Sequence, residues 1–568
     1  MEQTQTKVVS QAPLRSPETV MRLARLGSFH QSRLSFMRIL TRRMVRENWT
    51  FSRPVFDIDA NGVGHAVYCA HTPDRTYSLI AFAHDLPAEK RSDRVIAEAW
   101  DSTFTLFDGI PTDADINRLR DNIPLQEAGR VTETELSVSR ANRSVRLWEH
   151  TVSRLAAGQQ PDPQMMADVG YLMRTTAVYG SGKLGAADRE MIAARPECAA
   201  PFQIEMLNVF LIRAYVRDLV QHMARARGGD ATATLDPAIA RSIGIGNSTG
   251  LGMAPFLLNH PGLLHNWIAA RESAIARVRG LATATPDEVE TFRNLLNRSV
   301  VSADLWSSDH EIQVAKLATL RADLAALSDH VGQADLLENH PWDRLFQWAE
   351  GALGADAQEC LASLMLEPYG HLVDDLADTM SDDDSAGFRI DGAMTVGQIN
   401  AILQRDYDWA LKINWAAQDS CARAWYVSAE KLEPRLGERF DEPIADYEQP
   451  LAPGRDAAAL HAALAGAPAD EMIAAFLMRA PEHRHTVRRV QIADRKPFAE
   501  IRDNTIGSDL MPIDMLRCKL SFFGATHFDP RSDRWVRICL FGNAPYPDEL
   551  QTHGTDDWPY PPLDRAEQ

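Results

Sequence analysis

Helical spacing of apolar residues over most of the chain is the feature that most constrains its fold. The segments "NRSVRLWEHTVSRLAAG", "FQIEMLNVFLIRAYVRDLVQHMARARGG" and "EIQVAKLATLRADLAALSDHV" repeat apolar residues every three or four positions. That period places the apolar residues on one face of an α-helix. Gly228 and Gly229 follow the second segment, where a helix commonly ends. Residues 136–445 are therefore predicted to form a large helical body.

A shorter region before this body has the pattern of β-strands. Within residues 54–86, three apolar runs are separated by "DANG" and "TPDR", whose Asn-Gly and Pro-Asp pairs favour tight turns. "STFTLFDG" adds a fourth candidate strand, and "CKLSFFGA" and "RWVRICLFG" are interpreted as strands near the C-terminus. The predicted fold class is α+β: a predominantly α-helical body, a small N-terminal antiparallel sheet and a mixed C-terminal region.

The same patterns divide the 568 residues into five segments. We expect a disordered tail at residues 1–20, an α+β region with the antiparallel meander at 21–135, and the helical body at 136–445. A mixed α/β region at 446–545 and a Pro-rich acidic tail at 546–568 follow.

Composition narrows the classes of partner and cofactor. The net charge of −19 repels a phosphate backbone, so we expect no nucleic-acid partner. No run of about 18 apolar residues is present, which predicts no membrane span, and the first residues lack the apolar core of a secretory signal. The six cysteines stand singly, without metal-ligand spacing. We expect a soluble cytoplasmic protein of bacterial composition with no metal or cofactor, and a homo-oligomer stays open.

The segment "GIGNSTGLGMAPFLLNHP", residues 244–261, is the first candidate site. Its glycines do not follow a predicted strand, as those of a nucleotide-binding loop do, and no G-K-[ST] is present. Asn247, Ser248 and Thr249 precede a predicted helix, whose N-terminal N–H groups would suit a carboxylate or phosphate. His260 is a candidate acid–base group. The alternative is that Ser248 or Thr249 only caps the helix.

The same segment resembles the serine loop of the fumarase and aspartase superfamily, G-S-S-x-M-P-x-K-x-N-P. Ser248, Met253, Pro255, Asn259 and Pro261 carry the resemblance, which is confined to residues 247–261. It implies lyase chemistry on a carboxylate substrate. One residue separates the methionine from the proline, and no lysine stands where the family's substrate-binding lysine would, so the chain is not assigned to that family.

A second candidate lies in residues 414–440. If one helix extends to about residue 432, four polar residues at steps of four, three and four share a face: Asp419, Arg423, Tyr426 and Glu430. Arg435 enters a loop after Pro434. Guanidinium groups bind anions, and a phenol or carboxylate can transfer a proton. Lys183, in the glycine-rich "VYGSGKLG", could also reach an anion. The alternatives are a solvated, salt-bridged helix face and an ordinary surface loop.

The run "DDLAD", Asp374 to Asp378, resembles the D-D-x-x-D motif with which isoprenoid synthases hold magnesium diphosphate. In an α-helix Asp374 and Asp378 would share a face, as a bridging Mg²⁺ requires. The alternative is the acidic end of a helix that continues into a loop.

These residues predict a cytoplasmic enzyme that acts on a small anionic substrate, a carboxylate or phosphate, by acid–base chemistry. A lyase or isomerase is preferred. The catalytic candidates are Ser248, His260, Tyr426 and Glu430, and the substrate-binding candidates are Asn247, Thr249, Arg423, Arg435 and Lys183. We expect the loop at residues 244–260 and the stripe at residues 419–435 to face one pocket. The alternatives are a non-enzymatic helical scaffold or assembly subunit and a Mg²⁺-dependent enzyme that uses the DDLAD aspartates.

Overall fold

A computed structural model gives the fold of this chain. It describes residues 12–90, 99–122, 132–176, 192, 194–250, 253–381, 387–417, 425–428, 434–436, 448–451, 453–502, 511–526, 535–552 and 558–559. The chain forms two compact units, each made from three separate segments. Unit 1 comprises Met1–His30, Thr249–Leu296 and Glu311–Cys518, and unit 2 comprises Gln31–Ser248, Asn297–His310 and Lys519–Gln568.

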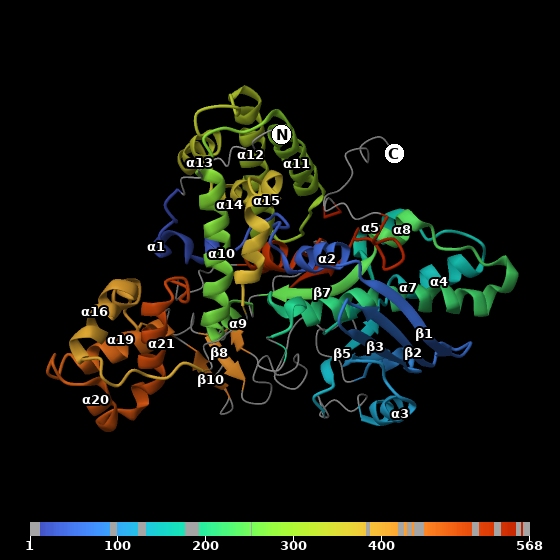
Figure 1. Ribbon diagram of the computed structural model, residues 1–568, viewed down its shortest axis with the longest axis horizontal. Helices are drawn as coiled ribbons and strands as arrows, with labels where there is room; N and C mark the ends of the chain where they lie inside the picture. The colour runs from blue at the N-terminus through green and yellow to red at the C-terminus, as the bar shows by residue number, and fades with distance from the viewer. Residues whose placement is uncertain are drawn as a thin grey trace. The chain divides into compact units, whose positions relative to one another are not determined.

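Unit 2 is built on an eight-stranded sheet (Figure 1). Its order is β1-β2-β3-β4-β5-β6-β7-β11. The strands are β1 Thr50–Ile58, β2 Gly64–His71, β3 Thr76–Ala83, β4 Ser102–Asp108, β5 Glu135–Arg143, β6 Tyr171–Thr175, β7 Gly244–Gly250 and β11 Trp535–Leu540. The first six strands pair antiparallel in succession, whereas β6 and β7 pair parallel.

The α+β class is confirmed, but the prediction of a small antiparallel sheet is wrong, because the sheet is large and mixed. The expected meander and its fourth strand are present as β1 to β4. The additional strands escaped the sequence pattern because segments such as "GIGNSTG" lack apolar alternation. Helices lie between β6 and β7, and a parallel neighbour needs such a crossover.

The C-terminal prediction is half correct. The strand expected in "RWVRICLFG" is β11. "CKLSFFGA" is instead the end of helix α22, Pro512–Cys518, followed by a π-helix at Lys519–Phe523, and every residue of both is buried. A run that is buried on all sides carries no period that could distinguish a helix from a strand.

Helices cover both faces of the sheet in unit 2. Helix α7, Gln203–Gly228, packs against strands β2 to β6 on one face. It is the long helix expected from the sequence, and it ends before Gly229, whose φ of 54° suits glycine. On the other face, Ile116 and Leu119 of α3, Asp113–Asn122, join an apolar cluster with strand residues such as Val67 and Ile80. The remaining helices are α2 Phe36–Arg46, α4 Trp148–Ala156, α5 Pro163–Val169 and α8 Pro237–Ser242.

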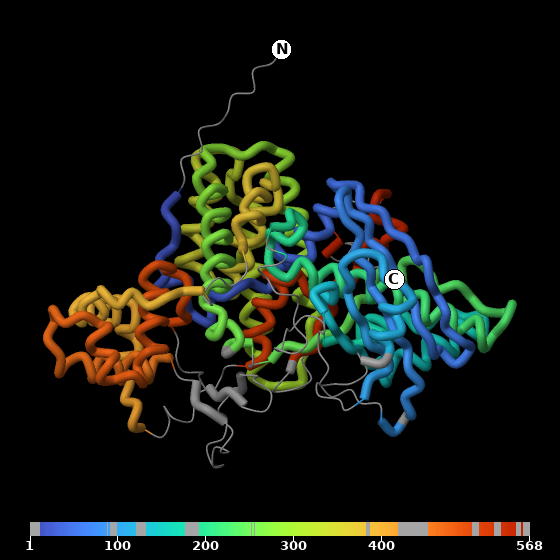
Figure 2. The backbone as a smooth tube through the Cα atoms, turned by 60° about the horizontal axis from the view of Figure 1, so that its bottom comes forward, coloured from blue at the N-terminus to red at the C-terminus, as the bar shows by residue number. Residues whose placement is uncertain are grey.

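Unit 1 is mainly helical, as expected for much of residues 136–445. Its helices include α9 Met253–Asn259, α10 Pro261–Arg279, α12 Glu311–Gln333, α13 Pro341–Ala352, α14 Ala355–Leu364, α16 Val396–Asp406, α17 Asp408–Leu411, α19 Pro453–Leu464, α20 Ile473–Arg479 and α21 Arg484–Arg495. Helix α11 spans Pro286–Leu305. The helices α16, α17, α19, α20 and α21 share one apolar cluster and form the orange group in Figure 2. Among the described residues, no helix has the length and apolarity required to cross a bilayer.

Part of the expected N-terminal tail is folded into unit 1. Helix α1 spans Pro17–Val20, and Arg15 is 8% exposed. The Arg15 guanidinium binds the carboxylates of Glu272 on α10 and Glu359 on α14. The prediction of disorder over residues 1–20 is therefore wrong for residues 12–20, because the partners of Arg15 lie more than 250 residues away in the sequence.

Candidate functional site

The first group of expected site residues lies on a strand. Asn247, Ser248 and Thr249 belong to β7, with Asn247 and Thr249 buried and Ser248 half-buried. The interpretation as a loop that begins a helix is wrong for these residues. The glycines allow close packing: a Cβ at Gly246 would lie 2.6 Å from the ring of Tyr171 on the neighbouring strand. These glycines therefore fit a strand into the sheet.

His260 lies between α9 and α10 and is half-buried. Its Nδ1 is 2.8 Å from the carbonyl oxygen of Phe256, and its ring lies 4.4 Å from the ring of Phe256. A carbonyl oxygen only accepts a hydrogen bond, so Nδ1 carries a proton there, and Nε2 is the acceptor of the neutral ring.

The second group of expected site residues, in residues 414–440, includes two that lie on strands instead of on one helix and the loop after it. Tyr426 lies on β8, Trp425–Ser428, and Arg435 lies on β9, Pro434–Leu436. A third strand, β10 Glu448–Leu451, completes the sheet. The expectation of one helix up to residue 432 is wrong, since consecutive aromatic and β-branched residues favour a strand. Tyr426 and Arg435 are nonetheless directly opposite cross-strand partners.

The other residues of that group lie outside the part of the chain that the structure describes. Arg423, Glu430 and Lys183 are among them. The pocket expected to join residues 244–260 with residues 419–435 therefore stays a prediction.

The aspartate run is not α-helical. Asp374–Thr379 forms a 3₁₀-helix, in which residues three apart share a face and residues four apart do not. Asp374 and Asp378 thus lack the alignment expected for a bridging Mg²⁺. Asp375 pairs with Arg277 at 2.7 Å. No group of three potential metal ligands occurs among the residues that the structure describes.

A different site lies in unit 2, and it starts from a bulge in the edge strand β1. Arg53 and Pro54 together oppose Tyr68 of β2, so β1 carries one extra residue at this point. Proline lacks an N–H group and is tolerated on an edge strand. The bulge places Val55 against the apolar cluster on the α3 face. It also places Phe56 on the α7 face, together with Arg53.

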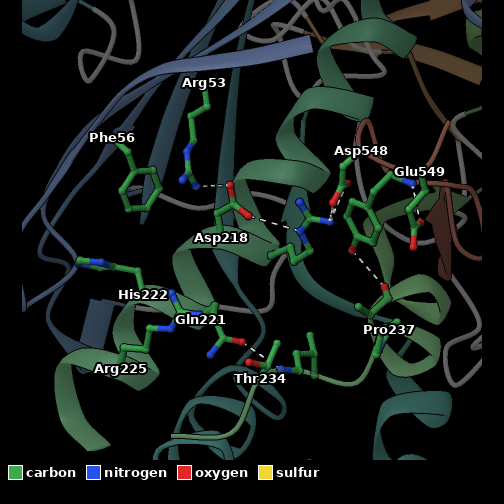
Figure 3. A pocket seen from close by; sticks show the side chains of 14 residues that line it. Arg53, Phe56, Asp218, Gln221, His222, Arg225, Thr234, Pro237, Asp548 and Glu549 are labelled. Atoms are coloured by element: carbon green, nitrogen blue, oxygen red, sulfur yellow. Dashed lines mark hydrogen bonds and ion pairs between the residues drawn. The ribbon is translucent and has the colours of Figure 1, made fainter. Parts of the chain in front are cut away.

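Helix α7 supplies the opposite wall. Gln221 and His222 lie three and four residues after Asp218 and four and three residues before Arg225, so the four side chains lie on one face of the helix. The Arg53 guanidinium donates to Asp218 at 2.5 Å, and the rings of Phe56 and His222 lie 5.4 Å apart (Figure 3). Strand β1 and helix α7 are thus joined by one ion pair and one aromatic contact beside the site.

A C-terminal segment forms the third wall. Tyr546 is buried, and its ring lies between two guanidinium groups of α7, 3.9 Å from Arg213 and 4.3 Å from Arg217. Arg217 also pairs with Asp548 at 3.0 Å, and Glu549 pairs with Arg241 at 3.1 Å. These contacts hold the segment beside α7 and α8.

These three walls, together with residues 234–240, line a cavity of about 510 Å³, which we name the α7 cavity. It is lined by Arg53, Phe56, Arg217, Asp218, Gln221, His222, Arg225, Thr234, Leu235, Pro237, Ala240, Tyr546, Asp548 and Glu549. Among the residues that the structure describes, none of those expected from the sequence as site residues lines it.

Comparisons with protein-family models, curated proteins and solved structures find no match. The chemistry of the site must therefore be derived from its own residues.

Among the described residues that line the α7 cavity, one guanidinium group has no carboxylate partner. Each lining carboxylate has an arginine partner: Asp218 with Arg53, Asp548 with Arg217, and Glu549 with Arg241. Arg225 also lines the cavity, is exposed, and has no carboxylate partner among the described residues. The C-terminal end of α7 carries partial negative charge, which stabilises a cation in the last turn. The cavity thus offers an unpaired guanidinium group to a ligand.

His222 has a defined neutral tautomer. Its Nε2 lies 2.9 Å from the carbonyl oxygen of Asp59, and a carbonyl can only accept, so Nε2 carries the proton. Nδ1 of the neutral ring is then the acceptor. The neighbouring Tyr68 phenol donates to Asp218 at 2.9 Å, and burial, followed by the Asp218 charge, raises the pKa of Tyr68 above its usual range. Tyr68 is therefore a hydrogen-bond donor and not a base.

Only part of this site was visible in the sequence. The spacing of Asp218, His222 and Arg225 in "RDLVQHMAR" places them on one helix face, a signal that we did not select. Arg53 and Tyr546 lie hundreds of residues apart, and only the bulge in β1 and the arginine contacts of Tyr546 bring them to the same helix.

Proposed function

We propose that this protein is an enzyme that binds a small anionic substrate, a carboxylate or phosphate, in the α7 cavity and acts on it by acid–base chemistry. The observation that carries the proposal is Arg225, the one lining guanidinium group without a carboxylate partner among the described residues. A guanidinium group binds carboxylates and phosphates through charge-assisted hydrogen bonds.

His222 supplies the proton transfer in this proposal. It lies three residues before Arg225 on the same face of α7, so an anion held by Arg225 is close to its ring. The hydrogen bond to Asp59 holds the proton on Nε2 and leaves Nδ1 to accept one. Removal of a proton near a carboxylate is a step shared by lyases and isomerases. The proposal keeps the substrate class and chemistry expected from the sequence but uses different residues.

Ligand binding can be tested by thermal denaturation of the whole protein against a panel of small carboxylates and phosphates. A ligand at 100 times its Kd stabilises the folded state by about 2.7 kcal/mol. We expect Arg225→Ala to weaken binding of an active ligand by about tenfold or more, as loss of a charged hydrogen bond does. Arg227→Ala is the matched control, because Arg227 is exposed in the same turn but pairs with Glu149 away from the cavity.

Catalysis is tested separately with His222→Gln, by following turnover of any ligand found by NMR. We expect ligand binding to persist and the rate to fall by about 100-fold or more, because general acid–base catalysis contributes at least that factor. Equal effects of Arg225→Ala and Arg227→Ala, or full activity of His222→Gln, would contradict the proposal.

A further inference from the structure

A second hollow adjoins the α7 cavity. This groove, of about 340 Å³, shares four charged residues with the α7 cavity: Arg53, Arg217, Asp218 and Asp548. Beyond them its lining is largely apolar, with Phe51, Leu211, Ala214, Pro547 and the ring of Tyr68. We name it the Phe51 groove.

The apolar lining has a rigid base. Leu211 and Ala214 of α7 line the groove and are only 1% and 2% exposed, so the core holds them in place. Phe51 is fixed against Phe210, with ring centroids 5.8 Å apart, and Tyr68 packs edge-on against Tyr215 at 6.3 Å. Bound hydrocarbon would therefore meet preformed apolar walls, which keeps the entropic cost of binding low.

The two hollows share lining residues, and the side chains that line only the Phe51 groove carry no charge. The unpaired Arg225 lies at the cavity side, and the ion pairs of Arg53 and Arg217 lie at the junction. We infer that the ligand is an amphipathic anion, with a carboxylate or similar anionic group in the α7 cavity and an apolar hydrocarbon group in the Phe51 groove. This inference rests on the proposed function, because it assumes that the anion binds at Arg225.

Asp548 gives the ligand access to the junction. Its side chain is 64% exposed, and it pairs with Arg217. An ion pair this exposed contributes little to stability, so a ligand anion can compete with Asp548 for the Arg217 guanidinium group. The head group then gains a second arginine while its chain lies over Leu211 and Ala214.

The test is a chain-length series of linear carboxylates, acetate, butyrate, hexanoate and octanoate, titrated into the whole protein by calorimetry. We expect each added methylene group to lower Kd about two- to fourfold until the groove is filled, as burial of CH₂ groups does. Octan-1-ol is the neutral control and should bind at least tenfold more weakly than octanoate.

Two variants of β1 separate the groove from general effects on the strand. Phe51→Ala removes a wall of the groove and should reduce the preference for octanoate over butyrate at least threefold. Val55→Ala truncates a side chain of the same strand on the opposite sheet face, so it should leave that preference unchanged. Circular dichroism of both variants confirms that the sheet is retained.

The outcomes distinguish this inference from the function on which it rests. Binding of all four carboxylates with equal Kd would overturn the amphipathic ligand and leave the anion site standing. Octanol binding as tightly as octanoate would overturn it also, because the anion would then be irrelevant. Failure of all four carboxylates to bind would overturn this inference, whereas the proposed function would be contradicted only if the phosphates of the ligand panel also failed to bind.

Discussion

At the scale of single residues, buried charge in unit 1 shows how a short N-terminal segment is held. Arg15 donates to both oxygens of Glu272 at 2.7 Å and to Glu359 at 2.7 and 3.1 Å. Arg271 adds contacts to the same two carboxylates at 3.1 and 3.4 Å. Carboxylates that are only 1% exposed would be strongly destabilising without such partners.

Glu359 gives this cluster a measurable dependence on pH. Burial alone would raise its pKa, but the charges of Arg15, Arg271 and Arg25 outweigh burial and lower the pKa to about 2. A lowered carboxyl pKa stabilises the folded state above the ordinary value of about 4.5, and that stability is lost as pH falls toward 2. We expect the loss to approach about 3 kcal/mol in the free energy of unfolding.

Denaturant unfolding at pH 5 and at pH 2 checks this expectation with Glu359→Gln. The variant should be less stable than the native chain by about 3–5 kcal/mol at pH 5, and the gap should narrow at pH 2. Glu350→Gln, an exposed change nearby in the sequence, should leave the pH dependence unaltered. A gap that is the same at both pH values would refute the argument.

At the scale of elements, the sequence predicted those turns and helices that depend on residues close together in the chain. The turn at residues 59–62 was predicted from its Asn-Gly pair, and in the structure the Asp59 side chain accepts from the N–H groups of Asn61 and Val63. Strand β7 was not predicted, because its glycines are required by close contacts with distant residues. The ring of Tyr171 and the carbonyl oxygen of Leu540 leave no room for a Cβ atom at Gly246 and Gly244. The candidate site depends on such distant contacts, so the sequence pattern showed only its α7 face.

Helix α7 organises several elements of unit 2 through Arg213. This side chain is 1% exposed and donates to three carbonyl oxygens, those of Ile243, Ala544 and Arg241, at 2.7, 2.8 and 2.8 Å. Burial lowers the pKa of Arg213, and the face of Tyr546 lies 3.9 Å from the guanidinium carbon. One helical arginine therefore connects the start of β7 to the C-terminal wall of the cavity.

Arg213→Met keeps an unbranched, flexible side chain, although a shorter one, and removes all three donors. We expect the free energy of unfolding to fall by about 3–5 kcal/mol, because buried carbonyl groups are left without partners. Hydrogen exchange near residues 243 and 544 should accelerate first. Arg227→Met, on the exposed face of the same helix, should cost at most about 1 kcal/mol. Similar losses in both variants would mean that Arg213 only fills space.

At the scale of the whole molecule, neither unit is a continuous stretch of chain. Unit 2 needs Lys519–Gln568 to complete a structure that begins at Gln31, whereas all three segments of unit 1 end by Cys518. Strand β11 is the last strand of the sheet order, and Val536, Ile538 and Leu540 within it are fully buried. Sequential division of the chain into domains misses this arrangement, because strands far apart in sequence share one sheet.

This arrangement predicts that unit 2 requires the C-terminal segment to fold, whereas unit 1 does not. A chain that ends at Thr526 lacks β11 and the Tyr546 contacts, and it exposes the apolar surface that they cover. Each fully buried aliphatic side chain contributes about 1.5–3 kcal/mol, so the total loss is comparable with the stability of a domain. We expect hydrogen exchange to show lost protection in β1 to β6 and retained protection in α10 and α14. A chain that lacks only residues 560–568 is the control and should behave as the full chain. Protection of β1 to β6 in the chain ending at Thr526 would show that the sheet folds without β11.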